Sequence, residues 1–525
     1  MLSKVLLICC FVSILILDVD CRCNETLSCV TQNGKHGFCM GGQCLAEVQS
    51  KSRTNLEFRI IAKYPEINIK EIKDKFLYIR GSGLGLNWTA GKKMTKTATD
   101  TWEILFTFTS SDNGFRCQDC SNDITITKKL EYRILIADKT NMIGGNFVVD
   151  LPVSMSSSYF HEKPLFKVYP WFYSKAGHAS NVTIHSPEIG KERKIYLYFP
   201  PSFNENTYKK YPNVVVFDLY PGGDSKILTP IVDKLLAETG TTKEFIIIGY
   251  GDYQPNHERF VLLTPVPGTY LTCANGTFFN LCDNCLPKNY TVDEEYLRLM
   301  IDKCGKRDNI QGFGDRLLDF VLHKVRPKAQ ELANNRILID QPNTGVMGYS
   351  LGGLMSCYAA WTRSTIFGLA ACQSPSLWWP LNNKTLNTSD FDFINNTLRD
   401  KSFQQRRFPQ KIVLDAGSEE TVSPYKLTQS TVETAKMISN TPGFTMNHNV
   451  WVNVYPGETH TVLEWFSHFW IVCQTLLPSA GAPQMPRIHT EPSGCVANIA
   501  SSYLNINFTL LICVQCARFL FYKGV

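Results

Sequence analysis

Strand and helix patterns alternate over residues 164–477, and this alternation constrains the fold more than any other feature of the sequence. Segments 214–217 and 245–248 are continuously apolar, as strands buried on both faces are. Between them, segment 227–236 repeats apolar residues at helical spacing, and Gly240 follows it. The alternation predicts an α/β fold with a mostly parallel sheet and helices on both faces.

The same pattern continues toward the C-terminus. We expect strands at 346–347, 411–414 and 451–454, and helices at 313–330, from Leu351 onward, at 426–439 and at 462–476.

Residues 55–150 have a different pattern, which is typical of β-strands. Apolar residues alternate with polar ones in 102–108 and 130–136, and 76–79 is a third candidate strand. Turn-rich stretches separate these segments, so we expect a β-sandwich. Trp102 lies on an apolar stripe and is expected in its core.

The N-terminus predicts secretion. An apolar run at 5–17 follows Lys4, and it is too short to span a bilayer but typical of a signal peptide, expected at 1–20. An uncleaved membrane anchor is the alternative interpretation. Sequons for N-glycosylation agree with secretion; they lie at Asn24, Asn87, Asn181, Asn275, Asn289, Asn383, Asn387, Asn395 and Asn507.

Cysteine usage also favours an oxidising compartment. The chain has 19 Cys, and five of them crowd into segment 21–52, which predicts a small disulfide-rich segment. Further cysteines at 117–120 and 273–304 are interpreted as disulfides rather than zinc ligands, because no matching His and Cys partners occur at the usual spacing. No metal or organic cofactor is expected. The odd total predicts at least one free thiol.

The charge of the chain favours no polyanionic partner. The formal net charge is +6 over 525 residues, and no block of Lys and Arg stands out. A nucleic-acid-binding function is therefore not expected.

The strongest motif for chemistry is Gly348-Tyr-Ser350-Leu-Gly352-Gly, which fits G-x-S-x-G between a predicted strand and a predicted helix. A serine on such a sharp turn needs small neighbours and is lifted clear of the backbone. Ser350 is therefore the candidate nucleophile. The N–H of Leu351, at the start of the helix, is a candidate donor to an oxyanion.

A serine nucleophile needs a histidine base and an acid, in the chain order Ser, acid, His. His460 lies between the last predicted strand and helix and is preferred to His468, which lies within the helical pattern. The acid is expected just after strand 411–414. Glu420 is preferred there, with Asp415 as the alternative.

These motifs resemble the enterochelin-esterase and esterase D-like family of the α/β-hydrolase fold. The resemblance covers most of residues 165–477. It rests on Arg193-Lys-Ile-Tyr-Leu-Tyr-Phe-Pro-Pro201, Arg259 followed by Leu263-Thr-Pro265, Asp340 before the Ser350 motif, Ser374-Pro-Ser-Leu-Trp-Trp379, Gly417-x-x-Glu420 and Gly457-x-x-His460. It implies a serine esterase and assigns Arg259 and Trp378 to substrate binding.

One segment departs from the family pattern. The family usually has His-Gly or Asp-Gly after the strand that here ends in Phe217-Asp218, and Leu219 replaces that glycine. The second oxyanion donor is expected to be the N–H of Leu219 or Tyr220.

Residues 55–150 resemble, more weakly, a starch-binding-type carbohydrate-binding module. The resemblance rests on 77–82, 84–88, Trp102 and 131–133. It implies that Trp88 stacks against a sugar, although a glycan on Asn87 would obstruct that face. A core position for Trp88 is the alternative.

The expected organisation is therefore a secreted, extracellular α/β-hydrolase that follows a β-sandwich and a small disulfide-rich segment. The boundaries are a signal peptide at 1–20, a cysteine-rich segment at 21–52, the sandwich at 55–150, the esterase domain at 165–478 and a tail at 479–525. The expected substrate is a small-molecule or glycan-linked ester. Two rival functions remain: acyl transfer by the same residues, and glycan binding by a catalytically weak protein.

Overall fold

The structure of the chain is a computed structural model. It describes residues 28–30, 36–40, 43–46, 55–69, 76–111, 114–117, 129–150, 165–221, 223–253, 257–273, 305–379, 409–422 and 425–479. The expected signal peptide, nearly all of the expected tail and the pairing of the cysteines in 21–52, 117–120 and 273–304 lie outside what is described. Within the described residues, no helix is both long and apolar enough to cross a membrane.

The first described strands form three sheets. A three-stranded antiparallel sheet contains β1 (Ser28–Val30), β2 (His36–Met40) and β3 (Gln43–Ala46). A five-stranded sheet has the order β11-β10-β5-β6 with β12 also on β10, and a second has the order β13-β4-β8-β7 with β9 also on β8. Their bounds are β4 (Asn55–Lys63), β5 (Leu77–Ser82), β6 (Lys92–Lys93), β7 (Thr95–Ala98), β8 (Thr101–Ser111), β9 (Gly114–Cys117), β10 (Lys129–Ile136), β11 (Thr140–Asn141), β12 (Phe147–Asp150) and β13 (Leu165–Val168), with a 3-10 turn η1 (Glu66–Asn68).

Alternating apolar side chains of the two five-stranded sheets pack into one cluster. Ile60 and Trp102 of one sheet and Ile79 and Ile134 of the other are fully buried in it. Trp102 is thus a core residue, as its apolar stripe predicted. Trp88 differs, since 42% of its surface is exposed.

The structure differs from the expected start of the esterase domain at residue 165. Strand β13 pairs in parallel with β4, with Leu165 opposite Arg59 and Val168 opposite Ala62. Residues 165–168 therefore belong to a sheet of the N-terminal half, and the large sheet begins at His178. A strand of four residues can pair with either the N-terminal sheet or the large sheet, and its own sequence does not show which.

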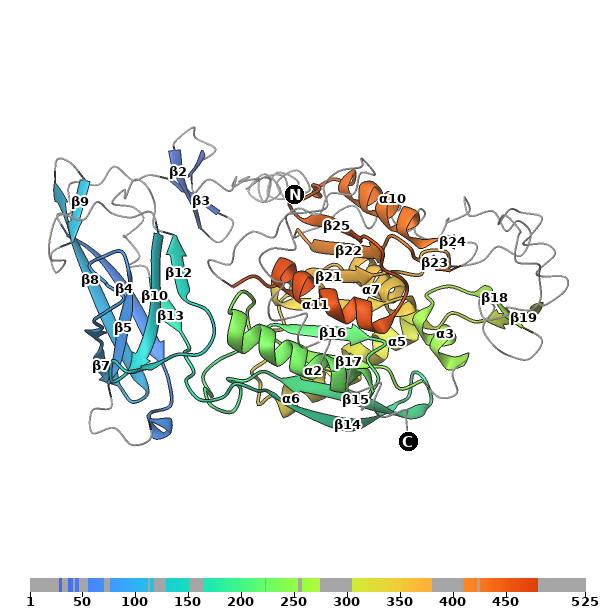
Figure 1. The fold of residues 1–525 in the computed structure, drawn as a ribbon, viewed down its shortest axis with the longest axis horizontal. Coiled ribbons are helices and arrows are strands. Elements are labelled where there is room, and N and C mark those ends of the chain that lie inside the picture. The colour runs from blue at the N-terminus through green and yellow to red at the C-terminus, as the bar shows by residue number, and fades with distance from the viewer. Residues whose placement is uncertain are drawn as a thin grey trace, which may run out of the picture. The chain divides into compact units, whose positions relative to one another are not determined.

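An eight-stranded mixed sheet occupies the second half, in the order β14-β15-β17-β16-β20-β21-β22-β25 (Figure 1). The pairs β14–β15 and β15–β17 are antiparallel, and the remaining pairs are parallel. The strands are β14 (His178–Ser186), β15 (Lys191–Phe199), β16 (Asn213–Phe217), β17 (Ile246–Tyr250), β20 (Thr344–Tyr349), β21 (Leu369–Gln373), β22 (Lys411–Gly417) and β25 (Val450–Tyr455). This agrees with the expected, mostly parallel α/β arrangement.

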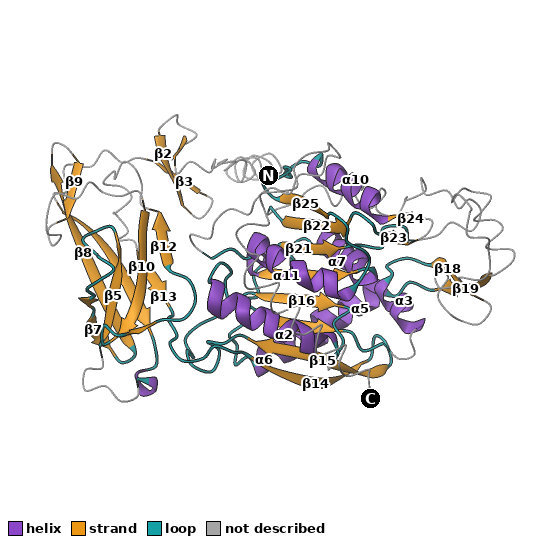
Figure 2. Cartoon of the chain, viewed as in Figure 1, coloured by secondary structure: helices purple, strands orange, loops and turns teal. Residues whose placement is uncertain are grey.

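Helices cover both faces of this sheet (Figure 2). One face packs on α2 (Asp224–Lys234), its π-helical continuation η2 (Leu235–Thr239) and α11 (Val462–Leu476). The other packs on α3 (His257–Leu263), α5 (Gly314–Phe320), η4 (Val321–Val325), α6 (Arg326–Leu332), α7 (Leu351–Thr362) and α10 (Leu427–Ser439). Two antiparallel two-stranded sheets, β18 (Gly268–Cys273) with β19 (Gly305–Ile310) and β23 (Thr421–Val422) with β24 (Tyr425–Lys426), and a 3-10 turn η5 (Gln341–Asn343) complete the described elements.

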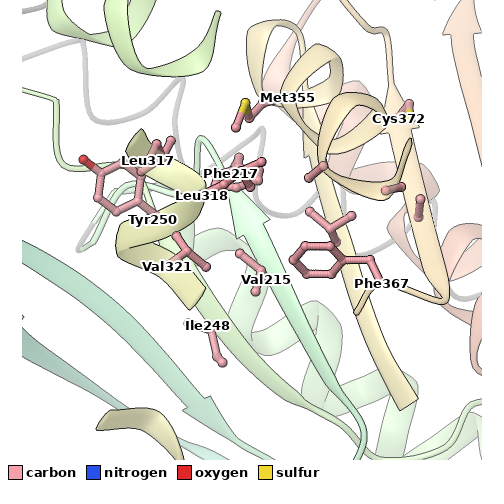
Figure 3. Packing of buried hydrophobic residues seen from close by; sticks show 14 of the residues in the cluster. Val215, Phe217, Ile248, Tyr250, Leu317, Leu318, Val321, Met355, Phe367 and Cys372 are labelled. Carbon is pink, nitrogen blue, oxygen red and sulfur yellow. The ribbon is translucent and has the colours of Figure 1, made fainter. Parts of the chain in front are cut away.

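The central strands are apolar on both faces, which explains their continuous apolar sequences. In β16, Val214 and Val216 point to the face that carries α2, and Val215 and Phe217 to the other. Figure 3 shows the latter pair among buried side chains of α5, η4 and α7. The cores on both sides hold the carboxyl ends of the parallel strands in fixed positions.

Candidate active site

Ser350 lies on the turn between β20 and α7, at the carboxyl edge of the sheet. Its backbone has φ 57° and ψ −121°, a conformation that disfavours residues with a side chain. The neighbouring glycines make room for it, because a Cβ on Gly348 would lie 2.6 Å from the carbonyl oxygen of Gly352. A Cβ on Gly353 would likewise lie 2.6 Å from the carbonyl oxygen of Gln373. The motif therefore has the strand, turn and helix that a nucleophile elbow requires.

His460 contacts Ser350 and Glu420 through its two ring nitrogens. Its Nε2 lies 3.0 Å from the Oγ of Ser350, and its Nδ1 lies 3.1 Å from Oε2 of Glu420. The loop that carries His460 is fixed at the next helix, where Thr461 caps α11 by accepting a hydrogen bond from the N–H of Glu464. Ser350, His460 and Glu420 thus form one hydrogen-bonded chain.

Of the two candidate acids, the structure brings Glu420 to His460. Glu420 is 2% exposed, and its Oε1 accepts hydrogen bonds from the N–H of Gly417, at 2.9 Å, and from the Oγ of Ser374, at 2.5 Å. The side chain of Asp415 lies nearby, and its Oδ1 accepts a hydrogen bond from the N–H of Ser374 at 3.3 Å. Burial, with a smaller effect of nearby Glu420, raises the pKa of Asp415 to about 8.

His468 lies in α11 and has other partners. Its ring stacks on Tyr455, with the ring centroids 3.3 Å apart, and its Nε2 lies 3.0 Å from Oε1 of Glu458. Neither contact involves Ser350, so the geometry favours His460 as the base.

The candidate oxyanion donors differ in the partners that their backbone N–H groups have in the structure. The N–H of Leu351 is at the first residue of α7, where a helix has no partner of its own for it. The N–H of Leu219 donates to the carbonyl oxygen of Tyr250 at 3.2 Å, and the Leu219 side chain is fully buried. The N–H of Leu219 is therefore engaged within the fold, and the N–H of Tyr220 also has a partner there. The Tyr220 N–H lies toward the carboxylate of Asp224, and burial raises the pKa of that carboxyl group.

Arg259 forms a bidentate salt bridge with Asp218 beside the Ser350 turn. Its Nε and one terminal nitrogen donate to the two carboxylate oxygens of Asp218, at 2.8 and 2.6 Å. Asp218 is buried, has φ 67° and also accepts from the N–H of Gly352 at 3.2 Å. These contacts hold the loop after β16 against α7, a role that the expected assignment of Arg259 to substrate binding did not include.

Trp378, which the family resemblance assigns to substrate binding, differs in burial from its neighbour Trp379. Trp379 is fully buried, and its Nε1 donates to the carbonyl oxygen of Val266 at 3.0 Å. Trp378 is half-buried and lies edge-on to Trp379, with centroids 6.1 Å apart. Trp88 lies in the loop between β5 and β6, where its carbonyl oxygen accepts a hydrogen bond from Arg80 at 3.4 Å.

Two residues with central contacts were not singled out from the sequence. Ser374 binds Glu420, and Trp465 of α11 lies edge-on to the His460 ring, with centroids 4.8 Å apart and planes at 82°. Ser374 lies in the Ser-Pro-Ser motif of the family pattern. The local sequence does not show that its side chain contacts Glu420, which follows a different strand.

Among the described residues, no group of three or more His, Cys, Asp and Glu side chains is placed to hold a metal ion. In the part of the chain that the structure describes, Cys473 of α11 is free and buried, and Cys357 of α7 forms a disulfide with Cys372 of β21.

Comparison with known proteins finds a family match in the second half of the chain. Residues 307–468 match the model of the Esterase family, described as "Putative esterase". A siderophore enterobactin esterase from Emericella nidulans is 32% identical over 84 residues, which are 16% of this chain and 26% of that protein. The match therefore spans about a quarter of the length of the curated relative.

Solved structures that are similar to this chain include two siderophore-related enzymes. The enterobactin esterase FES from Shigella flexneri is 13% identical, has a TM-score of 0.39, and the match covers 82% of this chain and 94% of that one. The siderophore hydrolase EstA from Aspergillus nidulans is 16% identical, has a TM-score of 0.40, and the match covers 57% and 94% of the two chains.

Proposed function

We propose, since residues 307–468 match the model of the Esterase family, that the protein is a carboxylic ester hydrolase with Ser350 as nucleophile, His460 as base and Glu420 as acid. The observation that carries the proposal is the continuous chain of contacts Ser350–His460–Glu420, at 3.0 and 3.1 Å. A histidine in this position takes the serine proton, and the buried carboxylate orients the ring and stabilises its positive charge.

The reaction has two steps. The Oγ of Ser350 attacks the ester carbonyl carbon while His460 takes its proton, and the N–H of Leu351 stabilises the oxyanion. The C–O bond to the alcohol then breaks, the alcohol leaves with the proton from His460, and an acyl-enzyme remains. Water, deprotonated by His460, attacks the acyl carbon and releases the acid and Ser350. No step calls for a cofactor.

The proposed substrate is an ester of an aromatic acid or an ester on a carbohydrate. Among the similar proteins, one is named an enterobactin esterase and another a ferulic acid esterase, so enterobactin and feruloyl esters are both included in the first tests. The purified full chain is incubated with feruloyl sugar esters, enterobactin and short-chain aryl esters, and the released acid is quantified. Release by the wild type and none by Ser350→Ala supports the proposal, and equal release by both variants contradicts it.

The same assay separates hydrolysis from acyl transfer. A sugar acceptor is added, and the free acid and the acylated sugar are measured together. Hydrolysis predicts that free acid dominates at every acceptor concentration. A new sugar ester that grows with acceptor at the expense of free acid would instead establish a transferase.

We further propose that the two N-terminal five-stranded sheets form a carbohydrate-binding sandwich with Trp88 as the stacking platform. The 42% exposure of Trp88 supports this role, because a flat exposed ring is free to contact a sugar. The expected result is that Trp88→Ala loses retention on an immobilised glycan array and keeps its esterase activity. Unchanged retention would exclude Trp88.

Secretion into an oxidising compartment is also proposed. The apolar N-terminal run, the sequons and the disulfide between Cys357 and Cys372 support it, because disulfides persist mainly outside the cytosol. Expression in a eukaryotic cell is expected to give a glycosylated protein in the medium, with a mass that falls after glycosidase treatment.

A further inference from the structure

Ser374, immediately after β21, binds two residues that flank the proposed base. Its Oγ donates to Oε1 of Glu420 at 2.5 Å and accepts from the Nε1–H of Trp465 at 2.7 Å. Ser374 is 1% exposed, so water does not replace these partners readily. A single hydroxyl group thus links the acid to the helix that begins beside His460.

Both partners of Ser374 also contact His460. The other carboxylate oxygen of Glu420 lies 3.1 Å from Nδ1 of the imidazole. The indole of Trp465 lies edge-on to the imidazole and stacks on Tyr349, with centroids 4.8 and 4.3 Å away. The imidazole is therefore held on two sides by groups that share the hydroxyl of Ser374.

The backbone around Ser374 is tied to the nucleophile turn and to β22. The N–H of Ser350 donates to the carbonyl oxygen of Gln373, and the N–H of Ser376 donates to the carbonyl oxygen of Ser350, both at 3.0 Å. The N–H of Ser374 donates to the carbonyl oxygen of Asp415 at 2.8 Å. These backbone hydrogen bonds fix the position from which the Ser374 side chain extends, relative to both Ser350 and the strand that precedes Glu420.

We propose that Ser374 is a positioning residue for the reaction, which fixes the rotation of the Glu420 carboxylate and thereby the orientation of His460. This inference rests on the proposed function. Without the hydroxyl, Oε1 of Glu420 keeps one hydrogen-bond donor among the described residues, the N–H of Gly417, and the carboxylate turns more freely. The buried indole N–H of Trp465 also loses its acceptor. A misoriented acid weakens proton transfer by the histidine and leaves substrate binding unchanged.

The test compares Ser374→Ala with Ser202→Ala. Ser202 is a matched control, because it is buried and its Oγ also donates to a buried glutamate, Glu244, at 2.5 Å. It follows the end of β15 that lies beside the amino ends of the parallel strands, at the opposite edge of the sheet from Ser350. Both substitutions remove a buried serine–carboxylate hydrogen bond, and only one of them removes it next to His460.

The expected result is a fall in kcat of roughly 10- to 100-fold for Ser374→Ala, with KM within about twofold of the wild type. Ser202→Ala is expected to keep the wild-type kcat although it also lowers Tm. In a Glu420→Ala background, Ser374→Ala should have no further effect on kcat, since the residue acts through that carboxylate. The near-isosteric Ser374→Cys, a weaker donor, should lie between wild type and Ser374→Ala and serves if the alanine variant does not fold.

Three outcomes overturn the inference: an unchanged kcat in Ser374→Ala, an equal fall in Ser202→Ala, or a full fall from Ser374→Ala in the Glu420→Ala background. The proposed function fails in a different way. In that case the wild type itself hydrolyses no ester and does not react with a fluorophosphonate at Ser350, whatever the Ser374 variants do.

Discussion

At the scale of single residues, the site combines a strained serine with buried carboxyl groups. Ser350 adopts φ 57° at the end of β20, where the backbone favours glycine. Glu420 and Asp415 are both about 2% exposed, and both accept hydrogen bonds from Ser374. Each feature costs stability, and each has a direct test.

The strain at Ser350 predicts that glycine is more stable than alanine at this position. Ser350→Gly and Ser350→Ala both remove the hydroxyl, but only glycine relieves the positive φ. We expect the free energy of unfolding of Ser350→Gly to be about 1 kcal/mol higher than that of Ser350→Ala. Denaturant unfolding of the two inactive variants measures the difference. A more stable alanine variant would show that the turn is not strained.

The raised pKa of Asp415 predicts a pH-dependent stability. Its folded pKa is about 8 and its ordinary value is 3.8, so the folded state keeps a proton that the unfolded chain releases above about pH 4. The contribution of this group is therefore fully present below pH 4 and is lost as the pH rises to 8.

Asp415→Asn removes that titration. The stability of the variant relative to wild type is expected to increase with pH, by at most about 1.4 kcal/mol per pH unit between pH 5 and 7. Unfolding curves of both proteins at pH 5, 6, 7 and 8 give the difference. A difference that stays constant over this range would mean that Asp415 is ionised in the folded protein.

At the scale of elements, the loop after β16 is joined to α3 and α7 by the Asp218–Arg259 pair. The Asp218 side chain is 1% exposed and that of Arg259 is 21% exposed, so the pair is largely shielded from water. Burial tends to lower the pKa of Arg259, but the charge and hydrogen bonds of Asp218 raise it overall. The loop carries Tyr220, and its position depends on this pair.

Arg259→Met leaves the Asp218 carboxylate buried without its main partner. The expected loss of stability is about 3–5 kcal/mol, measured by thermal or denaturant unfolding. The double variant Asp218→Asn/Arg259→Met should recover part of that loss, since no buried charge remains unpaired. A variant Arg259→Met with wild-type Tm and a raised KM would restore the substrate-binding role that the family pattern implies.

At the scale of the whole molecule, the regular spacing of apolar residues made the order of helices and strands predictable. The helix expected at 462–476 is α11, Val462–Leu476, and the apolar run at 214–217 is β16 with one more residue. Ser350, Glu420 and His460 could be chosen because each follows a strand at the same edge of one sheet. Residues 307–468, which match the Esterase family, include all three.

The parts that could not be predicted depend on partners far away in the sequence. The N–H of Leu219 donates to the carbonyl oxygen of Tyr250. A pattern of side chains does not show which backbone donors already have a partner. Ser374 meets Glu420 only because β21 and β22 are neighbours, and β13 joins the N-terminal sheet only because it pairs with β4. Long-range pairing of this kind leaves little trace in local composition.

The central claim is that His460 activates Ser350, and covalent labelling with a fluorophosphonate tests it most directly. Intact-mass analysis of the folded full chain is expected to show one adduct, mapped to Ser350 by peptide sequencing. Ser350→Ala should give no adduct, and His460→Ala should slow labelling by at least about 100-fold. A folded wild-type protein that remains unlabelled, or that is labelled at the same rate without His460, would contradict the account.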